Sequence, residues 1–200
     1  MQTTTEEGPR TTGRSAATRR ALQDAAQEIF ARHGYAQASI ADIVERSKSS
    51  VGSLYHHYGG KSGLFLALWE TYQRGQEQRA AAAVAGAKER GVTEPIELFV
   101  AGARAFLEGC WENREVARLF LENDGPTGFD LVRRGRGQEW VRQNTKLLRV
   151  DDTKPSGHVL VTMLTSVIGE AGREVAACED ETEAEEVIEE VCRILVRLSG

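Results

Sequence analysis

The sequence predicts an all-α fold of about nine helices in two domains. Its 200 residues contain only four prolines and 6% aromatic residues, whereas alanine, glutamate, arginine and leucine are abundant. Apolar residues recur three and four positions apart in many segments, which is the spacing of one face of a helix. With 40% apolar residues, the chain is long enough to bury a core in one or two small domains.

The first fourteen residues, 1–14, show no apolar periodicity and are predicted to be a disordered basic arm. No acidic residue occurs between Gly8 and Gln23, and four arginines gather in and after the arm: Arg10, Arg14, Arg19 and Arg20. A flexible basic arm is able to lie along DNA phosphates or in a minor groove. It is equally able to be a solubilising tail, and the residues leave both interpretations open.

A first helix is predicted at residues 15–33, with Gly34 placed to end it. Its apolar stripe consists of Leu22, Ala25, Ala26, Ile29 and Phe30. Two short helices are then predicted between Ser39 and Lys61, joined by a polar turn. Ser39 and Ser50 are good N-cap residues for these two helices. Such a pair with a short turn forms a helix-turn-helix, whose second helix fits the major groove of DNA.

The second of these helices turns Leu54 and Tyr58 inward and leaves an outer face without acidic residues. Gly52 lies on this face, although glycine inside a helix costs roughly 1 kcal/mol relative to alanine. Close approach to DNA is one reason for it, and a stray glycine on a solvated helix is the alternative. The predicted base-edge contacts are Val51, Ser53 and His56, beside Gly52. The predicted phosphate contacts are Ser39, Lys48, Ser50, Tyr55 and Lys61.

This stretch resembles the DNA-binding signature of the TetR family of bacterial helix-turn-helix transcriptional repressors. The matching segments are Phe30-x-x-x-Gly34-Tyr35, Ser39-Ile40-x-x-Ile43-Val44, Ser50-Val51-Gly52-Ser53-Leu54-Tyr55, His57-Tyr58-x-x-Lys61 and Leu64-Phe65. The resemblance is strong over residues 16–70. Lys48 stands where the family usually has a glycine that ends the first helix, and Ser49 where it usually has a buried valine. We therefore expect a less tight turn.

Beyond residue 70 the resemblance implies a helical domain that binds a small-molecule effector and forms a homodimer. We accordingly place the DNA-binding domain at residues 15–61 and the effector-binding and dimerisation domain at residues 62–200. Residues 1–61 hold eight Lys or Arg and six Asp or Glu, a net charge of +2, whereas residues 62–200 hold 17 and 24, a net charge of −7. A basic domain beside an acidic one still attracts phosphate, because charges act over only about 8 Å.

Six further helices are predicted at about residues 61–87, 95–111, 114–122, 129–150, 158–178 and 182–198. Residues 86–95 and 151–157 are predicted loops, and residues 124–128 a turn. Two glycines between Arg133 and Gly137 predict an interruption in the helix at 129–150. The helix that begins near Lys61 starts in the first domain and ends in the second, so it is placed to carry motion between them.

Large apolar side chains on several of these helices are candidates for an effector pocket, with polar groups that would orient a ligand. The candidates are Phe99, Phe106, Trp111, Phe120, Trp140, Asn144, Met163 and Glu170. An ordinary helical core is the alternative for each of them, and the existence of a pocket is implied by the resemblance alone.

The last two helices carry apolar faces wider than one stripe, which predicts two partners: the rest of the domain and a second copy of the chain. The predicted interface residues are Val159, Met163, Val167, Val187, Val191, Ile194, Leu195 and Leu198. A twofold four-helix bundle is the simplest arrangement, because helix-turn-helix proteins usually present two copies of the motif about one DNA turn apart. A helical hairpin folded wholly against its own core is the alternative.

The common enzyme motifs G-x-S-x-G and H-E-x-x-H and phosphate-binding glycine loops do not occur in the sequence. We therefore predict no catalytic residue, cofactor or metal site. His56 and His57 are adjacent and would point about 100° apart on a helix. Cys110, Cys178 and Cys192 are an odd, widely spaced set, typical of reduced thiols in the cytoplasm. Neither a membrane-spanning run nor a signal peptide is recognisable, so a cytoplasmic location is expected.

The sequence thus predicts a TetR-like repressor that leaves a palindromic DNA operator when a small molecule binds its C-terminal domain. Two alternatives remain. One is a DNA-binding regulator without an effector. The other is a ligand-sequestering or enzymatic helical protein whose helix-turn-helix is vestigial.

Overall fold

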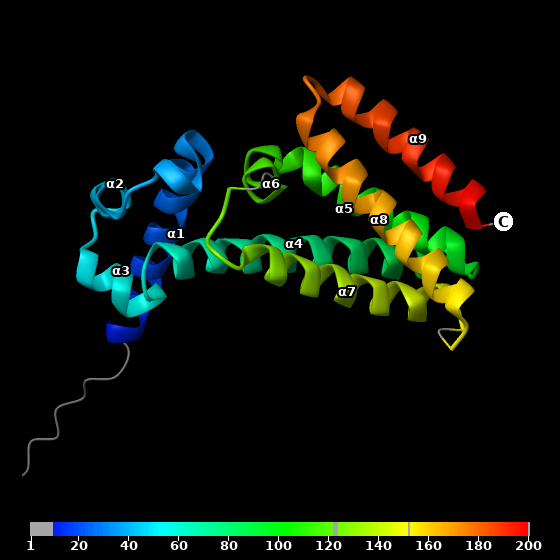
Figure 1. Ribbon diagram of the computed structural model, residues 1–200, viewed down its shortest axis with the longest axis horizontal. Helices are drawn as coiled ribbons and strands as arrows, with labels where there is room; N and C mark the ends of the chain where they lie inside the picture. The colour runs from blue at the N-terminus through cyan, green and yellow to red at the C-terminus, as the bar shows by residue number, and fades with distance from the viewer. Residues whose placement is uncertain (1–9, 122–123, 152, 200) are drawn as a thin grey trace, which may run out of the picture. The chain divides into compact units, whose positions relative to one another are not determined.

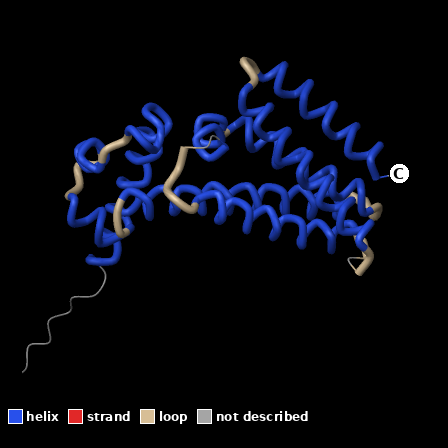
Figure 2. Tube along the Cα trace, viewed as in Figure 1, coloured by secondary structure: helices blue, strands red, loops and turns tan. Residues whose placement is uncertain are grey.

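The computed structural model describes residues 10–121, 124–151 and 153–199, and within them it contains α-helices and no strand (Figures 1 and 2). The helices are α1 (Arg10–Gln37), α2 (Ile40–Arg46), α3 (Val51–Tyr58), α4 (Lys61–Glu89), α5 (Pro95–Glu112), α6 (Arg114–Leu121), α7 (Phe129–Leu148), α8 (Pro155–Ala177) and α9 (Glu181–Ser199). The predicted all-α class is confirmed. The last six helices begin and end within three residues of the predicted limits.

The chain divides into two compact units. The first, which we call the head, consists of the described residues up to Thr71 together with Asp124–Pro126. The second, the body, consists of the remaining described residues. The division falls ten residues later than the predicted end of the DNA-binding domain at residue 61, because the start of α4 packs in the head: the ring centroids of Phe65 and Phe30 lie 5.6 Å apart. Helix α4 therefore runs from the head into the body.

Helix α1 is longer than predicted at both ends. It already includes Arg10–Arg14, which were expected to be disordered, while residues 1–9 of the predicted arm lie outside the described residues. At its other end the helix bends at Gly34, which has a φ of 73° and a ψ of 168°, and continues to Gln37. Gly34 therefore marks a bend followed by one more turn, where the sequence predicted the end of the helix.

The body core lies among α5, α8 and α9. Its fully or nearly fully buried side chains include Phe99, Leu107, Cys110, Leu164, Val175, Ile188 and Leu195. At the edge of this core, Arg104 of α5 donates to Glu185 and Glu189 of α9 at 2.9 and 2.5 Å. None of the helices in the described segments has the length and apolar character needed to cross a membrane.

The predicted interruption of α7 between Arg133 and Gly137 is wrong, because α7 is helical throughout. Gly135 and Gly137 have no neighbouring side chain near them, so the helix passes through both positions unobstructed. Side chains between and after the glycines hold α7 in place: Arg136 donates to Glu77 of α4 at 2.5 Å, and the Trp140 ring packs edge-on to Phe106 of α5. Tertiary contacts thus outweigh the weak helix propensity of the two glycines.

Candidate nucleic-acid interface

Helix α2 begins at Ser39, as predicted from the sequence. The Ser39 backbone is extended, with a φ of −104°, and its hydroxyl oxygen accepts a hydrogen bond from the Asp42 backbone N–H at 3.1 Å. The same hydroxyl donates to the Asp42 carboxylate at 2.7 Å, so the Ser39 and Asp42 side chains hold each other in place. Ile43 is completely buried and anchors the helix to the head. The first helix of the motif is therefore held at its start and on its inner face.

The turn between α2 and α3 is tight, contrary to our expectation from Lys48 and Ser49. The Ser49 N–H donates to the carbonyl of Val44 at 3.0 Å, and the Lys48 N–H donates to the carbonyl of Glu45 at 3.1 Å. These two bonds are the Schellman pattern that ends many helices. Lys48 adopts a φ of 51°, a left-handed conformation that glycine tolerates better. The lysine therefore leaves the turn closed and strains its own backbone.

Helix α3 is fixed in the same way. The Ser50 hydroxyl accepts the Ser53 N–H at 3.1 Å, and Leu54 is completely buried. The Tyr58 hydroxyl donates to the carbonyl of Arg19 at 2.8 Å, which ties the end of α3 to α1. Burial raises the pKa of Tyr58. The inward orientation predicted for Leu54 and Tyr58 is thus found in the structure.

The outer face of α3 is exposed and carries no acidic side chain. Val51 and Tyr55 are 49% and 53% exposed, and Gly52 and His56 are also exposed. Ser53 is only half-buried, and its hydroxyl lies 3.0 Å from that of Ser50. A Cβ atom on Gly52 would meet nothing closer than the Ser50 hydroxyl at 3.9 Å, so no packing inside the chain requires this glycine.

Lys61 does not present its charge as the sequence predicted. Its ammonium donates to the carbonyls of Tyr35 and Ala38 at 2.8 and 2.9 Å, and lies 4.4 Å from the centre of the Tyr35 ring. Its position at the start of α4 suggested a phosphate contact, but the ammonium reaches the carbonyls of Tyr35, in the last turn of α1, and of Ala38, just after that helix. The structure thus gives the charge of Lys61 an internal partner, the backbone between α1 and α2.

Two residues of the head escaped the sequence analysis. A Cβ atom on Gly63 would overlap the carbonyl oxygen of Tyr58, so α4 approaches the end of α3 more closely than any other residue allows. Asp124 accepts a hydrogen bond from the N–H of Ala36, 88 positions earlier. The sequence carried no signal for either, because Gly63 precedes the apolar stripe of α4 and Asp124 is distant in sequence from its partner.

The positive charge of the head is partly neutralised. Glu28 accepts from Arg32 at 3.0 Å and from Arg46 at 2.7 Å. Among the described residues, the head's other exposed cations lack an ion-pair partner; they are Arg14, Arg19, Arg20 and Lys48. The guanidinium of Arg19 lies 5.9 Å from the centre of the Tyr58 ring, next to the end of α3. Cations without carboxylate partners are the groups that attract phosphate most effectively.

Comparisons with known proteins agree with this geometry. Residues 22–68 match the family model described as bacterial regulatory proteins, tetR family. The A-factor receptor protein of Streptomyces griseus is 35% identical over 162 residues, which are 77% of this chain and 55% of that protein. The HTH-type transcriptional repressor AcnR of Corynebacterium glutamicum is 40% identical over 50 residues, 25% of this chain and 27% of that one. The chain thus spans only about a quarter to a half of these relatives.

A solved structure extends the likeness over the whole fold. The TetR-like transcriptional regulator from Rhodococcus sp. RHA1 superposes with a TM-score of 0.68 and 22% identity, over 97% of this chain and 100% of the other. Residues 22–68 therefore match the TetR family in sequence, and the whole chain shares the fold of a TetR-like regulator. The matched residues contain α2, α3 and the cap residues described above.

The body brings only some of the predicted pocket residues together. The rings of Phe106 and Trp140 lie 5.9 Å apart, and Phe99, Phe120 and Asn144 are buried. Trp111 is half-buried under the guanidinium of Arg114. Met163 is 53% exposed and Glu170 is exposed and paired with Arg173, so these two lie on the outer face of α8 and do not line the body interior.

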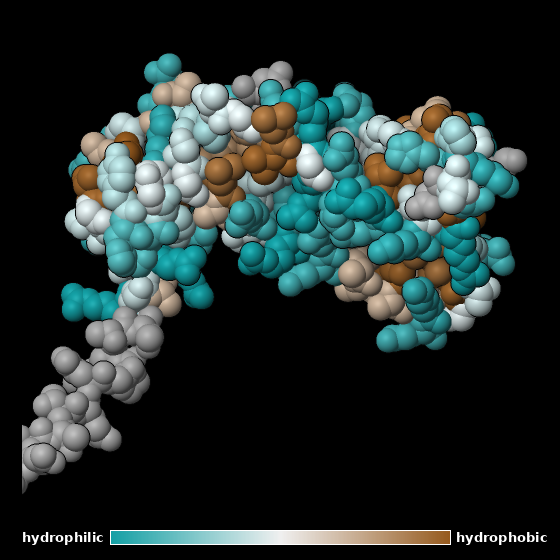
Figure 3. Space-filling view, turned by 60° about the horizontal axis from the view of Figure 1, so that its bottom comes forward, coloured by the Kyte–Doolittle hydropathy of each residue, from teal (hydrophilic) through white to brown (hydrophobic). Residues whose placement is uncertain are grey.

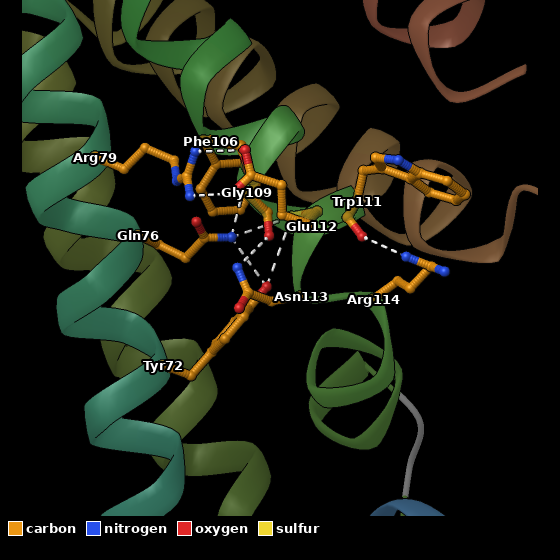
Figure 4. Close-up of polar contacts among 10 residues, drawn as sticks. Tyr72, Gln76, Arg79, Phe106, Gly109, Trp111, Glu112, Asn113 and Arg114 are labelled. Carbon is orange, nitrogen blue, oxygen red and sulfur yellow. Dashed lines mark hydrogen bonds and ion pairs between the residues drawn. The ribbon is translucent and has the colours of Figure 1, made fainter. Parts of the chain in front are cut away.

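A buried polar cluster joins α4 to α5 near these residues (Figure 4). The Gln76 side-chain amide donates to the Tyr72 hydroxyl at 3.0 Å, to the Cys110 sulfur at 3.3 Å and to the Phe106 carbonyl at 3.4 Å. Burial raises the pKa of the Cys110 thiol to about 11 and also raises that of Tyr72. Beside the cluster, Arg79 and Glu112 form an ion pair. In the described residues no three His, Cys, Asp or Glu side chains are placed to hold a metal.

The predicted dimer residues of α8 and α9 divide into two groups. Val159, Met163 and Leu198 are 54%, 53% and 44% exposed, while Val167, Val187 and Ile194 are half-buried. Val191 and Leu195 face the chain's own core, because they fall on the stripe of α9 that also carries Ile188. Val196, which we did not predict, is 50% exposed. Figure 3 shows apolar patches of this kind surrounded by hydrophilic surface.

Proposed function

We propose that this protein is a sequence-specific DNA-binding transcriptional regulator of the bacterial cytoplasm, and that it acts as a repressor. The observation that carries the proposal is the exposed face of α3, where Val51, Gly52, Tyr55 and His56 are solvent-accessible and none is acidic. A helix held rigidly on its inner side, with such an outer face, fits the major groove of B-DNA. The names of the relatives, which include a repressor, support the same function.

The residues of the interface have different roles in this proposal. Val51 and His56 contact base edges, where valine packs against a thymine methyl group and imidazole bonds with a base. Tyr55 and Ser50 donate to phosphates, joined by the unpaired cations Lys48 and Arg20. Lys61 supports DNA binding indirectly, because its ammonium donates to backbone carbonyls of the turn before α2 and so holds that turn. Base contacts therefore come from α3 and phosphate contacts from its surroundings.

The protein binds a palindromic operator as a homodimer in this proposal. The exposed apolar residues Val159 and Met163 on α8, and Val196 and Leu198 on α9, favour association through these two helices. An isologous dimer places the same surface of each copy against the other, so it presents two copies of α3 to the two half-sites of an inverted repeat.

A small molecule that binds the body releases the operator. The relative from Streptomyces griseus is a receptor by its name, which supports a ligand-responsive body in this chain. A ligand shifts the DNA-binding equilibrium only through different affinities for two states of the protein. The effector-bound state is thus one in which the two copies of α3 no longer match successive major grooves.

Selection of random duplex DNA on the purified protein tests the proposal, with the binding of the enriched sequences then measured at several salt concentrations. An enriched inverted repeat, with an affinity that falls steeply with salt, supports a dimeric sequence-specific regulator. His56→Ala should relax the preference at one base position of each half-site. Salt-sensitive binding without any enriched sequence would refute sequence-specific recognition by α3.

A regulator without a small-molecule effector is the second candidate, and the cluster around Gln76 favours it. Gln76 is only 2% exposed, and its amide already has three partners inside the chain, so this group needs no ligand. Screening small molecules for thermal stabilisation and for operator release separates the candidates. A compound that does both supports an effector; compounds that stabilise the protein and leave operator affinity unchanged support the second candidate.

A further inference from the structure

A single helical turn connects α1 to α2, and its first N–H group needs a partner. Beyond the bend at Gly34 the chain makes one turn, residues 35–38, before Ser39 starts α2. The first N–H groups of any helical turn have no partner within it, and a side chain just before the turn usually accepts from them. Gly34 occupies this place and has no side chain. The cap of this turn must therefore come from elsewhere.

Asp124 supplies the cap. Its two carboxylate oxygens lie 3.1 and 3.2 Å from the backbone nitrogen of Ala36. A Cβ atom on Gly34 would overlap one of these oxygens, so the carboxylate occupies the space that a side chain at position 34 would fill. Gly34 also has a φ of 73° and a ψ of 168°, a combination that glycine alone adopts easily. The glycine and the distant aspartate together replace one local N-cap residue.

The opposite end of the turn is held by a cation. The Lys61 ammonium donates hydrogen bonds to the carbonyls of Tyr35 and Ala38. A carboxylate at the N-terminal end of a helical turn and an ammonium at its C-terminal end both match the direction of the backbone dipoles. Residue 38 leads directly into the N-cap Ser39, so the orientation of this turn determines where α2 begins.

We infer that Asp124 is a positioning residue for DNA binding, which holds the turn at residues 35–38 and thereby the direction of α2 and α3. Asp124 lies in the connection between α6 and α7, two helices of the body, although Asp124–Pro126 belong to the head. The DNA-binding unit is therefore completed by a segment that the body helices carry. Operator affinity then depends on whether this connection keeps its carboxylate on Ala36. The inference rests on the proposed function only in its DNA-binding readout.

The negative charge of Asp124 lets the test distinguish loss of the cap from a change in electrostatic attraction to DNA. Asp124→Ala and Asp124→Asn remove a negative charge from a DNA-binding unit, and electrostatics alone would make both variants bind DNA more tightly. Loss of the cap predicts the opposite. We expect about tenfold weaker operator binding by Asp124→Ala and a smaller loss by Asp124→Asn, whose amide oxygen remains an acceptor. Asp130→Asn is the matched control, because it removes the same charge from α7, where Asp130 pairs only with the nearby Arg133.

Two measurements on the full-length variants decide the inference. Amide hydrogen exchange at Ala36 reports the cap without DNA, and fluorescence anisotropy with the selected duplex reports the operator affinity. Faster exchange at Ala36 together with weaker binding in Asp124→Ala, and neither change in Asp130→Asn, supports the inference. Unchanged exchange at Ala36 overturns the cap. Faster exchange with operator affinity equal to that of Asp130→Asn overturns the positioning role.

The same measurements separate this inference from the proposed function. If the wild-type protein bound no duplex, the proposed function would fail, whereas exchange at Ala36 would still show whether Asp124 caps the turn. Thermal melts of Asp124→Asn show whether the variant remains folded. A folded Asp124→Asn that binds the operator more tightly than wild type would overturn the inference on electrostatic grounds.

Discussion

Replacing Gly52 with alanine should make the protein more stable and a weaker DNA binder. In the folded chain a Cβ atom at this position meets only the Ser50 hydroxyl, at 3.9 Å, which is an ordinary contact. The glycine therefore has no packing role inside the molecule. Alanine in a helix is favoured over glycine by about 0.5–1 kcal/mol, because glycine loses more backbone freedom on folding. We expect the free energy of unfolding to rise by about this amount in Gly52→Ala.

The effect on DNA binding has the opposite sign. Gly52 lies between Val51 and Ser53 on the first turn of α3, the part of a recognition helix that reaches deepest into the major groove. A methyl group forced into a close contact costs about 1–3 kcal/mol, which corresponds to roughly fivefold to 150-fold weaker binding. Chemical denaturation gives the first quantity, and anisotropy titration of the selected operator gives the second.

Gly75→Ala is the matched control for this prediction. Gly75 lies in the interior of α4 with no atom within 4 Å of an added Cβ, so alanine there should stabilise the protein by about 1 kcal/mol. Its operator affinity should equal that of the wild type. If Gly52→Ala gained stability and kept full operator affinity, the face of α3 at Gly52 would not approach DNA, and our assignment of the interface would be wrong.

Three further predictions follow from the structure. Lys48→Gly should raise the free energy of unfolding by about 1 kcal/mol, because glycine tolerates the left-handed backbone at this position. If Lys48 contacts a phosphate, the same variant should reduce the salt slope of operator binding by about one. An unchanged slope would show that Lys48 lies outside the interface. Gly63→Ala should lower the free energy of unfolding by about 1–3 kcal/mol, because its methyl group would overlap the Tyr58 carbonyl, and a neutral effect in denaturation would contradict the close approach of α3 and α4. Burial raises the pKa of the Cys110 thiol from 9.0 to about 11, so the folded protein keeps this proton where the unfolded chain has lost it. The contribution of the thiol to stability is therefore complete below pH 9 and falls by about 2 kcal/mol as the pH rises to 11. A Cys110→Ala variant with the same loss of stability over this pH range would contradict the assignment.

The helix-turn-helix could be predicted almost residue by residue, because its determinants are local. Ser39 and Ser50 cap helices a few positions away, and the apolar spacing of Leu54 and Tyr58 identifies the inner face of α3. Lys48 misled us, because we judged the turn from the preference for glycine. The backbone bonds of the turn form with any residue that accepts a left-handed conformation, at a modest energetic cost.

The residues that could not be predicted act over long distances in the sequence. Lys61 reaches the carbonyls of the turn at residues 35–38, and Asp124 reaches the N–H of Ala36 across 88 positions. A sequence pattern shows which residues have charge, but not which backbone group a folded chain will bring to them. The same limit explains Glu170, which was predicted to orient a ligand but is exposed, and Met163, which was predicted both for the pocket and for the dimer surface and is exposed.

The first and last residues of the body helices were predicted well, whereas the surfaces that their side chains form were predicted less well. Pro95 begins α5, as predicted, whereas Pro155 was predicted to lie in a loop and begins α8 three residues before the expected start. Val191 and Leu195 were assigned to a dimer surface from their apolar character alone. Apolar character shows that a residue prefers burial; whether its own chain or a second copy buries it depends on the packing of α5 against α9.

The ion pairs of Glu28 have a consequence for how the protein would find its operator in a genome. By engaging Arg32 and Arg46 at once, this glutamate confines the head's exposed, unpaired cations among the described residues to Arg14, Arg19, Arg20 and Lys48. Binding to random sequence depends almost entirely on the counterions that such cations displace, so the two ion pairs should lower it. Each encounter with random DNA during the search would then be shorter than it would be with both arginines free.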